Sequence, residues 1–388
     1  MAPLFFQYKF TIKDINDIII IVGENMKKKK KPNYKLRRAI AKIIIAIIII
    51  IPIILINLDK IKRIPVYYNN KDFKKVVDAF FDSNYTIEEV NDIMVELRNN
   101  KRLNEVEPDM VISLNNKGYS HKTINYIIKN MSKQEITKLL NKKYDKEFEK
   151  YILVDNFVLS KYSRYLNYQK ENPKLSLDDI VTRVELNLDK EAYEDSVEEE
   201  DPNSITALVN KHRYMSKDYV PDDLVEMEDA YSNNSYGVNE LRKEAYEQFK
   251  KMVDDAKKED ITFYAESAYR GYKYQDLIYD NYVYEYGVEK TDTFAARAGF
   301  SEHQLGTTID LANIWTIEEG DPEYKWIDKN GYKYGYIFRY KKEFEDITGY
   351  KAEGWHIRYV GVEAATTIHK KNLTFDEYWV KYVKNNSK

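Results

Sequence analysis

The sequence predicts a chain of mixed α+β class, in which a C-terminal α+β domain follows an all-α spacer and one N-terminal transmembrane helix. Three observations support this division. Residues 39–58 form a continuous apolar run, and residues 72–190 carry Ile and Leu three or four positions apart, as the buried stripes of helices do. Nearer the C-terminus, Thr307–Leu311 and Trp355–Val360 are β-branched or alternating segments, which are typical of strands.

Composition excludes several classes of protein before any motif is considered. The chain has 388 residues, enough for roughly two or three domains, and its formal net charge of −3 gives no basic excess for binding nucleic acid. It has no cysteine, so disulfides, thiolate metal sites and cysteine nucleophiles are all excluded. Any metal ion must therefore be bound by His, Asp or Glu.

The apolar run AIAKIIIAIIIIIPIILINL, residues 39–58, predicts the transmembrane helix. About 20 residues span about 30 Å as a helix, which matches the hydrocarbon core of a bilayer. A cleaved signal peptide and a buried core helix are the alternatives, but no small-residue cleavage site follows the run and no polar face interrupts it. The basic flank over residues 27–38 predicts that residues 1–38 are a cytoplasmic tail and that the C-terminal bulk is extracytoplasmic. Met26 directly precedes this flank and is a candidate translation start.

Residues 59–193 are predicted to form an all-α extracytoplasmic spacer. Several of its helical segments begin with a capping residue, as at Thr86, and Glu89 stands at the position that a capping box requires. The acidic segment EDSVEEEDPN, residues 194–203, has no periodicity and predicts a linker. A separate C-terminal domain is then expected over residues 204–388.

Two of the five histidines lie in motifs that can carry chemistry. His303 and Asp310 flank Gly306, where a sharp turn onto a strand would bring an imidazole and a carboxylate together. His356 follows Glu353 on the second predicted strand. Two histidines and one aspartate supply the three protein ligands typical of a catalytic zinc ion, and Glu353 is then close to the ion as a general base without binding it. The remaining histidines lack such surroundings and are set aside: His121, His212 and His369.

These motifs resemble the signature of the VanY-type D-alanyl-D-alanine carboxypeptidases, a family of zinc peptidases. The family signature is Ser-x-His-x-x-Gly-x-Ala-x-Asp, followed downstream by Glu-x-x-His. The matching residues here are Ser301, His303, Gly306, Thr308 and Asp310, then Glu353 and His356. Five further segments match in the family's order: Leu208–Lys211, Tyr219–Leu224, Ser267–Gly271 with Gln275, Tyr334–Tyr340 and Ile347–Tyr350. Two positions depart from the pattern, because Thr308 replaces the usual alanine and Gly354 stands where proline is common.

The resemblance, which covers residues from about 205 to the end, implies the chemistry of the site residue by residue. Zinc (Zn2+) would be bound by His303, Asp310 and His356. Glu353 would activate the attacking water, and Arg270 would stabilise the negative charge that develops on the scissile carbonyl. Ser301 and Gln275 would help to hold the substrate. The family fold also implies that a small antiparallel sheet flanked by helices carries the zinc.

The function implied by the resemblance is removal of the C-terminal D-alanine from peptidoglycan stem peptides by metal-activated water. An L,D-carboxypeptidase or an endopeptidase acting on the same polymer would use the same metal centre, so both alternatives stay open. A non-catalytic wall-binding protein is a third alternative, although a binding domain has no need for Glu353 beside the metal. The expected location is the cell membrane, through the single N-terminal helix, with the catalytic domain on the cell-wall side.

Overall fold

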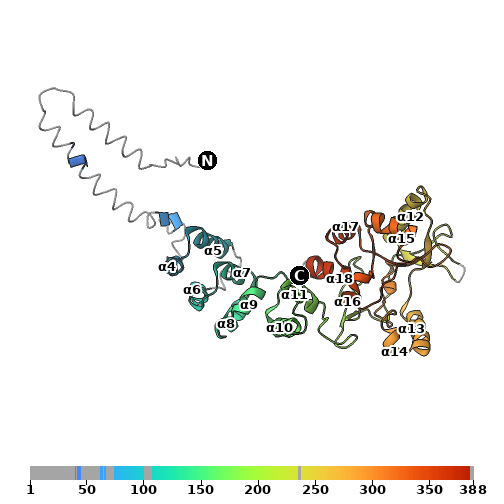
Figure 1. The fold of residues 1–388 in the computed structure, drawn as a ribbon, viewed down its shortest axis with the longest axis horizontal. Helices are drawn as coiled ribbons and strands as arrows, with labels where there is room; N and C mark the ends of the chain where they lie inside the picture. Colours follow the sequence, from blue (N-terminus) through green and yellow to red (C-terminus); the bar gives the residue numbers. More distant parts are fainter. Residues whose placement is uncertain are drawn as a thin grey trace, which may run out of the picture. The chain divides into compact units, whose positions relative to one another are not determined.

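The computed structural model describes residues 74–99, 107–234 and 237–384, together with isolated helical residues at 40, 42–44, 62, 63, 65 and 66. The predicted cytoplasmic tail and nearly all of the predicted membrane helix lie outside these residues. Within the described part of the chain, no helix is both long enough and apolar enough to cross a bilayer. The chain forms two compact units, Met1–Ser132 and Lys133–Lys388, and each unit is described by itself (Figure 1).

The first unit is built from two helical hairpins. Its helices are α4 (Lys74–Asp82), α5 (Ile87–Asn99), α6 (Pro108–Lys117) and α7 (His121–Asn130). Helix α4 contacts α6 and α5 contacts α7, which buries the apolar stripes of all four helices. The Tyr85 hydroxyl donates to the carbonyl of Tyr119, its counterpart 34 residues later in the second hairpin. The two hairpins are therefore copies of one motif, in which a tyrosine and then a hydroxyl residue precede the second helix.

The predicted capping box at the start of α5 is confirmed. The Glu89 backbone N–H donates to Thr86 Oγ1, and the Thr86 N–H donates to the Glu89 carboxylate. The same glutamate lies 3.0 Å from His121 Nδ1. His121, which was set aside from the sequence, therefore has an acidic partner, because the fold brings the N-terminal ends of α5 and α7 together.

The second unit begins with a helical layer. This layer contains α8 (Lys133–Leu140), α9 (Lys146–Tyr151), the 3-10 turn η2 (Leu159–Lys161), α10 (Tyr162–Glu171) and α11 (Leu177–Glu185). Helix α11 is tied to the C-terminal part of the unit by Lys381–Asp178 at 2.6 Å and Arg183–Asp346 at 2.5 Å. The two compact units divide after Ser132, and the acidic segment 194–203 lies within the second unit. That segment instead contains strand β1 (Val197–Glu198), which pairs in parallel with β2 (Arg213–Tyr214).

The remainder of the second unit is an α+β domain with small antiparallel sheets, as predicted. A four-stranded sheet runs in the order β5 (Tyr264–Ser267), β6 (Thr308–Ala312), β8 (His356–Tyr359) and β7 (Tyr336–Phe338), and each neighbouring pair is antiparallel. A separate pair consists of β3 (Leu224–Glu226) and β4 (Glu240–Arg242). The helices and turns around them are α12 (Lys243–Lys257), α13 (Tyr272–Tyr286), α14 (Val288–Thr291), η3 (Glu302–Leu305), α15 (Pro322–Asn330), η4 (Gly331–Tyr334), η5 (Lys342–Phe344), α16 (Glu345–Thr348), α17 (Val362–Lys371), α18 (Phe375–Tyr378) and the π-helical turn η6 (Trp379–Val383).

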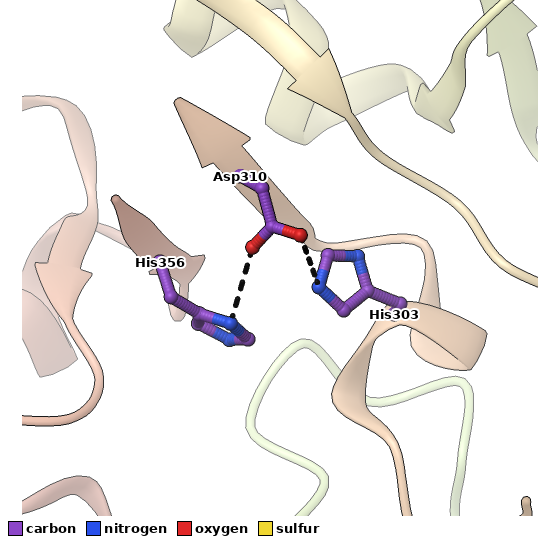
Figure 2. Close-up of side chains that lie close together, drawn as sticks. All are labelled: His303, Asp310 and His356. Carbon is purple, nitrogen blue, oxygen red and sulfur yellow. Dashed lines mark ion pairs between the residues drawn. The ribbon is translucent and has the colours of Figure 1, made fainter. Parts of the chain in front are cut away.

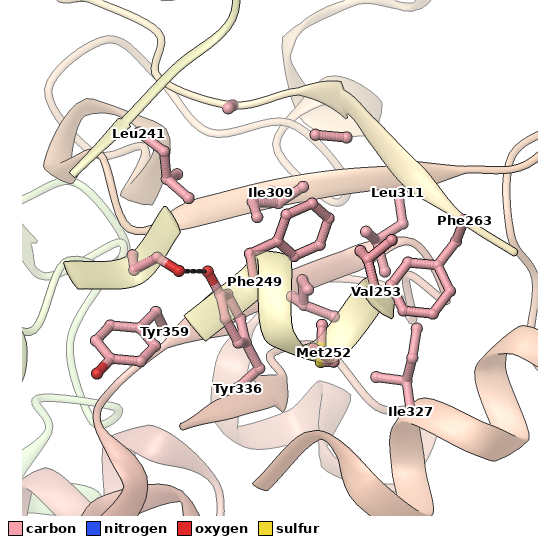
Figure 3. Packing of buried hydrophobic residues seen from close by; sticks show 14 of the residues in the cluster. Leu241, Phe249, Met252, Val253, Phe263, Ile309, Leu311, Ile327, Tyr336 and Tyr359 are labelled. Carbon is pink, nitrogen blue, oxygen red and sulfur yellow. Dashed lines mark hydrogen bonds between the residues drawn. The ribbon is translucent and has the colours of Figure 1, made fainter. Parts of the chain in front are cut away.

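The sheet is apolar on one face and polar on the other. Because side chains alternate along a strand, Ile309, Leu311 and Ile357 all point to the face that α12 covers. Phe249 and Met252 of α12 join them in one buried cluster (Figure 3). The alternate positions on β6 and β8 carry the polar side chains Thr308, Asp310, His356 and Arg358. The opposite face of the sheet therefore holds ionisable groups on strands fixed by a packed core.

Candidate metal and catalytic site

The three predicted metal ligands converge on the polar face of the sheet. Asp310 and His356 are direct cross-strand partners in the β6–β8 pair, which places their side chains next to each other. His303 comes from the turn η3, and Gly306, in the left-handed conformation with φ 65°, lets the chain turn from η3 into β6. One ligand atom from each of these three side chains lies within 4.8 Å of the others (Figure 2).

His303 presents one ring nitrogen to this centre and uses the other to fix its orientation. Its Nδ1 is 2.6 Å from the carbonyl oxygen of Ala268, and its Nε2 is 3.3 Å from Asp310 Oδ2. Burial and the nearby Arg270 guanidinium lower the pKa of His303 to about 4, so the ring is neutral at neutral pH. Nδ1 then donates its proton to the carbonyl, which leaves the Nε2 lone pair facing the carboxylate.

His356 presents Nδ1, the other kind of ring nitrogen. This atom lies 3.3 Å from Asp310 Oδ1 and 3.2 Å from Glu353 Oε2. Burial alone would lower the pKa of His356, but the neighbouring carboxylates of Asp310, Glu302 and Glu353 outweigh it and hold the pKa well above its ordinary value. The arrangement therefore favours positive charge at the point where these side chains meet.

The donor set fits a divalent cation. Among the described residues, neither His303 Nε2 nor Asp310 Oδ1 has a hydrogen-bond partner, although both atoms are buried. Buried acceptors without a donor are costly. A cation between two imidazole nitrogens and a carboxylate would satisfy them, and nitrogen and oxygen donors in this ratio suit zinc.

Glu353 and Arg270 lie at the edge of this centre. Glu353 is 9% exposed, its backbone N–H donates to the Tyr340 carbonyl at 2.9 Å, and burial raises the pKa of its carboxyl above the ordinary value. Arg270 donates from Nη2 to Asp310 Oδ2 at 3.0 Å. A buried carboxylate with a raised pKa accepts a proton more readily than an exposed one, and a guanidinium can stabilise an oxyanion.

All seven residues selected from the sequence line one cavity of about 380 Å³: Arg270, Gln275, Ser301, His303, Asp310, Glu353 and His356. The cavity also has aromatic walls, from Tyr282, Phe294, Tyr340, Tyr350 and Trp355. Gln275 is buried, and its Nε2 donates to the carbonyl of Ala296 at 2.7 Å, so it supports a wall of the cavity. Apart from the metal ligands, the site is thus a partly apolar pocket with a few polar groups.

The two departures from the family signature have different surroundings. Gly354 lies so close to the next loop that a Cβ atom would be 2.7 Å from the backbone nitrogen of Glu319. The ring of a proline at this position would collide with that loop, so the glycine matches this chain's local packing. Thr308 is completely buried on β6, and its Oγ1 has no hydrogen-bond partner among the described residues.

The sequence interpretation missed a buried ionic cluster behind the metal ligands. Glu302, the variable residue of Ser-x-His, pairs with Arg339 at 2.8 Å and Arg358 at 3.2 Å. One signal was available, because Arg358 stands two residues after His356 and must share its face of the strand. His212, set aside earlier, is 6% exposed and is not among the residues that line the cavity.

The chain is similar to known carboxypeptidases. The family model "VanY: D-alanyl-D-alanine carboxypeptidase" matches residues 238–362. The putative carboxypeptidase YodJ of Bacillus subtilis (strain 168) is 41% identical over 192 residues, which cover 48% of this chain and 70% of YodJ. A D-alanyl-D-alanine carboxypeptidase of Enterococcus faecium is 37% identical over 150 residues, which cover 37% of this chain and 47% of the relative. The solved structure of the LdcB LD-carboxypeptidase has 38% identity and a TM-score of 0.46, covering 50% of this chain and 92% of LdcB.

Proposed function

The chain belongs to the VanY D-alanyl-D-alanine carboxypeptidase family, and from this premise we propose that it is a zinc-dependent hydrolase of peptidoglycan stem peptides. Its reaction is removal of the C-terminal D-alanine from stems that end in D-Ala-D-Ala. The observation that carries the proposal is the convergence of His303, Asp310 and His356 within 4.8 Å, with the Glu353 carboxylate 3.2 Å from one of these ligands. A protein that only binds the cell wall would need the three converging side chains at most, and would have no need for the Glu353 carboxylate beside them.

The residues of the site divide the work. When bound by the two histidines and the aspartate, zinc supplies Lewis acidity, which polarises a carbonyl and lowers the pKa of water. Glu353 accepts a proton from the attacking water and returns it to the departing amine, and its raised pKa suits both transfers. Arg270 stabilises the negative charge that develops on the carbonyl oxygen. Ser301 and Gln275 line the cavity beside these groups, and in this proposal they help to hold the substrate.

Product analysis of muropeptides tests this reaction. We expect the zinc-loaded full-length protein to shorten pentapeptide stems by one alanine, and chelation of the metal to abolish this activity until zinc is restored. Glu353→Gln should still bind one zinc ion but lose activity by about 10²- to 10⁴-fold, the usual contribution of a general base. Shortening of tetrapeptide stems alone would indicate an L,D-carboxypeptidase, and cleavage of cross-links an endopeptidase. Tight muropeptide binding without release of any amino acid would refute the proposal that the protein is an enzyme.

The location of the protein is a second part of the proposal. The apolar run of residues 39–58 and its basic flank support an anchor with the catalytic domain on the cell-wall side of the membrane. In this proposal residues 59–193 are the spacer that joins the predicted membrane helix to the catalytic domain. Adding protease to intact cells stripped of their wall should digest the C-terminal domain. Digestion only after lysis would place the domain in the cytoplasm and contradict this orientation.

A further inference from the structure

Four charged side chains form a buried cluster behind the metal ligands. Glu302, Arg339, Arg358 and Asp376 are each 3% exposed or less. Two carboxylates and two guanidinium groups balance in charge, but desolvating four ions is costly, and apolar side chains would often be at least as stable in their place. The cluster therefore calls for a role besides stability.

Glu302 uses its two oxygens differently. Its Oε1 accepts a hydrogen bond from Arg339 Nε at 2.8 Å and lies 3.2 Å from Arg358 Nη1. Its Oε2 has no hydrogen-bond partner among the described residues and lies 3.8 Å from His356 Nε2, a buried nitrogen that also has none. Both arginines thus hold one oxygen, which leaves the other directed at the imidazole of a metal ligand.

We propose that Glu302 is a positioning residue that accepts the Nε2 proton of His356 and thereby directs the Nδ1 lone pair toward the metal. This inference rests on the proposed zinc site. A neutral imidazole carries one proton, so a proton held on Nε2 leaves Nδ1 free to bind the ion. The Nε2–Oε2 separation of 3.8 Å is longer than a hydrogen bond, so the proposal requires it to shorten when the ion is bound.

Residues outside the part matched by the family model hold Glu302 in this position. Arg339 Nη1 lies 2.7 Å from Asp376 Oδ2, and Asp376 Oδ1 accepts from Asn210 Nδ2 at 2.8 Å. Asp376 in α18 and Asn210 both lie beyond residues 238–362. Arg358 in turn donates to the carbonyls of residues 205 and 207, each at 3.1 Å. With both guanidinium groups fixed, the Glu302 carboxylate cannot rotate away from His356.

The two histidine ligands are therefore oriented by different means. A backbone carbonyl, that of Ala268, accepts the Nδ1 proton of His303, whereas a side-chain carboxylate accepts the Nε2 proton of His356. The Ala268 carbonyl is neutral, and because it belongs to the backbone it remains when the side chain of residue 268 is substituted. A carboxylate is charged and can be removed by substitution, so only the second contact can be tested by a single isosteric change.

The test is Glu302→Gln in the full-length protein, with zinc affinity measured by competition against a chromophoric chelator. Removing a residue that orients a ligand typically lowers metal affinity 10- to 100-fold, and we expect a loss in that range. The matched control is Glu244→Gln. Glu244 accepts from the Tyr359 hydroxyl at 2.6 Å, so it also contacts β8 but does not contact His356. The zinc affinity of Glu244→Gln should therefore equal that of the wild type.

A second measurement separates positioning from general damage to the fold. Nitrogen-15 NMR of selectively labelled histidines in the zinc-loaded wild type should show His356 protonated at Nε2 and metal-bound at Nδ1. A metal-bound Nε2, or a zinc affinity of Glu302→Gln equal to wild type, would overturn the proposal. The wild-type spectrum decides the question even if Glu302→Gln fails to fold. If the wild-type protein does not bind zinc at all, the proposed function is refuted instead. If the wild type binds zinc but does not release D-alanine, the zinc affinities and the histidine spectrum still test the role of Glu302.

Discussion

Substituting Gly306 by alanine should destabilise the catalytic unit and weaken its metal site together. Gly306 has φ 65°, a conformation that costs an alanine about 1–2 kcal/mol. A Cβ there would lie 2.8 Å from Leu224 Cδ2 and 3.1 Å from Arg242 Cγ. The leucine methyl can move, but Arg242 is held by Asp223 at 2.7 Å, so crowding adds about 1–2 kcal/mol, the lower part of the range for overpacking. The total is about 2–4 kcal/mol.

Urea unfolding of Gly306→Ala, with zinc affinity measured on the same sample, tests this estimate. The control is Gly320→Ala, because Gly320 also has a positive φ but nothing within 4 Å of its added Cβ. Gly320→Ala should lose only the stability that a positive φ costs an alanine, and its zinc affinity should equal that of the wild type. Equal losses of stability in the two variants would show that crowding at Gly306 is absent. Unchanged zinc affinity in Gly306→Ala would show that the turn does not set the positions of His303 and Asp310.

Two further predictions concern contacts away from the metal. Lys384 and other groups hold the pKa of Glu185 below its ordinary 4.5 against burial, so Glu185 contributes stability above that pH which is lost as pH falls toward the lowered pKa. The free energy of unfolding of Glu185→Gln, measured in urea at pH 7, should therefore be about 3 kcal/mol lower than that of the wild type. This difference should narrow below pH 4.5; if it does not, the carboxylate of Glu185 does not supply the stability. Lys211 donates to the carbonyls of Asp292 and Gly349 at 2.6 and 2.7 Å, close in the chain to the cavity-lining residues Phe294 and Tyr350. Lys211→Met should therefore raise KM about tenfold with little change in kcat, whereas a loss confined to kcat would show that Lys211 does not shape the cavity.

The elements that carry the site could be predicted from local sequence. Thr307–Leu311 and Trp355–Val360 were expected as strands, and the structure has β6 at Thr308–Ala312 and β8 at His356–Tyr359. Both segments succeed because they are rich in β-branched or aromatic residues, which suit a sheet packed on a helix. The turn at Gly306 was predictable for a similar reason, since a left-handed residue is needed there.

The features that failed prediction depend on partners distant in sequence. The acidic segment 194–203 has the composition of a linker, yet Glu199 pairs with Arg213 at 3.0 Å and Val197 lies in a strand. Nothing in the segment itself indicates these partners, so composition alone could not predict that the segment contains a strand and an ion pair. The buried Glu302 cluster is the same case, because its members come from four separate parts of the chain.

The distribution of the metal ligands explains why the site can be rigid before an ion binds. Asp310 and His356 are fixed by one antiparallel pair whose other face is buried against α12, so neither strand can shift without disrupting that core. A slip of the pairing by one residue would turn both side chains into the apolar cluster. Only His303 lies outside the sheet, and its ring is held by a carbonyl of the segment that follows β5. Packing of the sheet on α12 therefore sets the positions of Asp310 and His356, and the Ala268 carbonyl sets the orientation of His303.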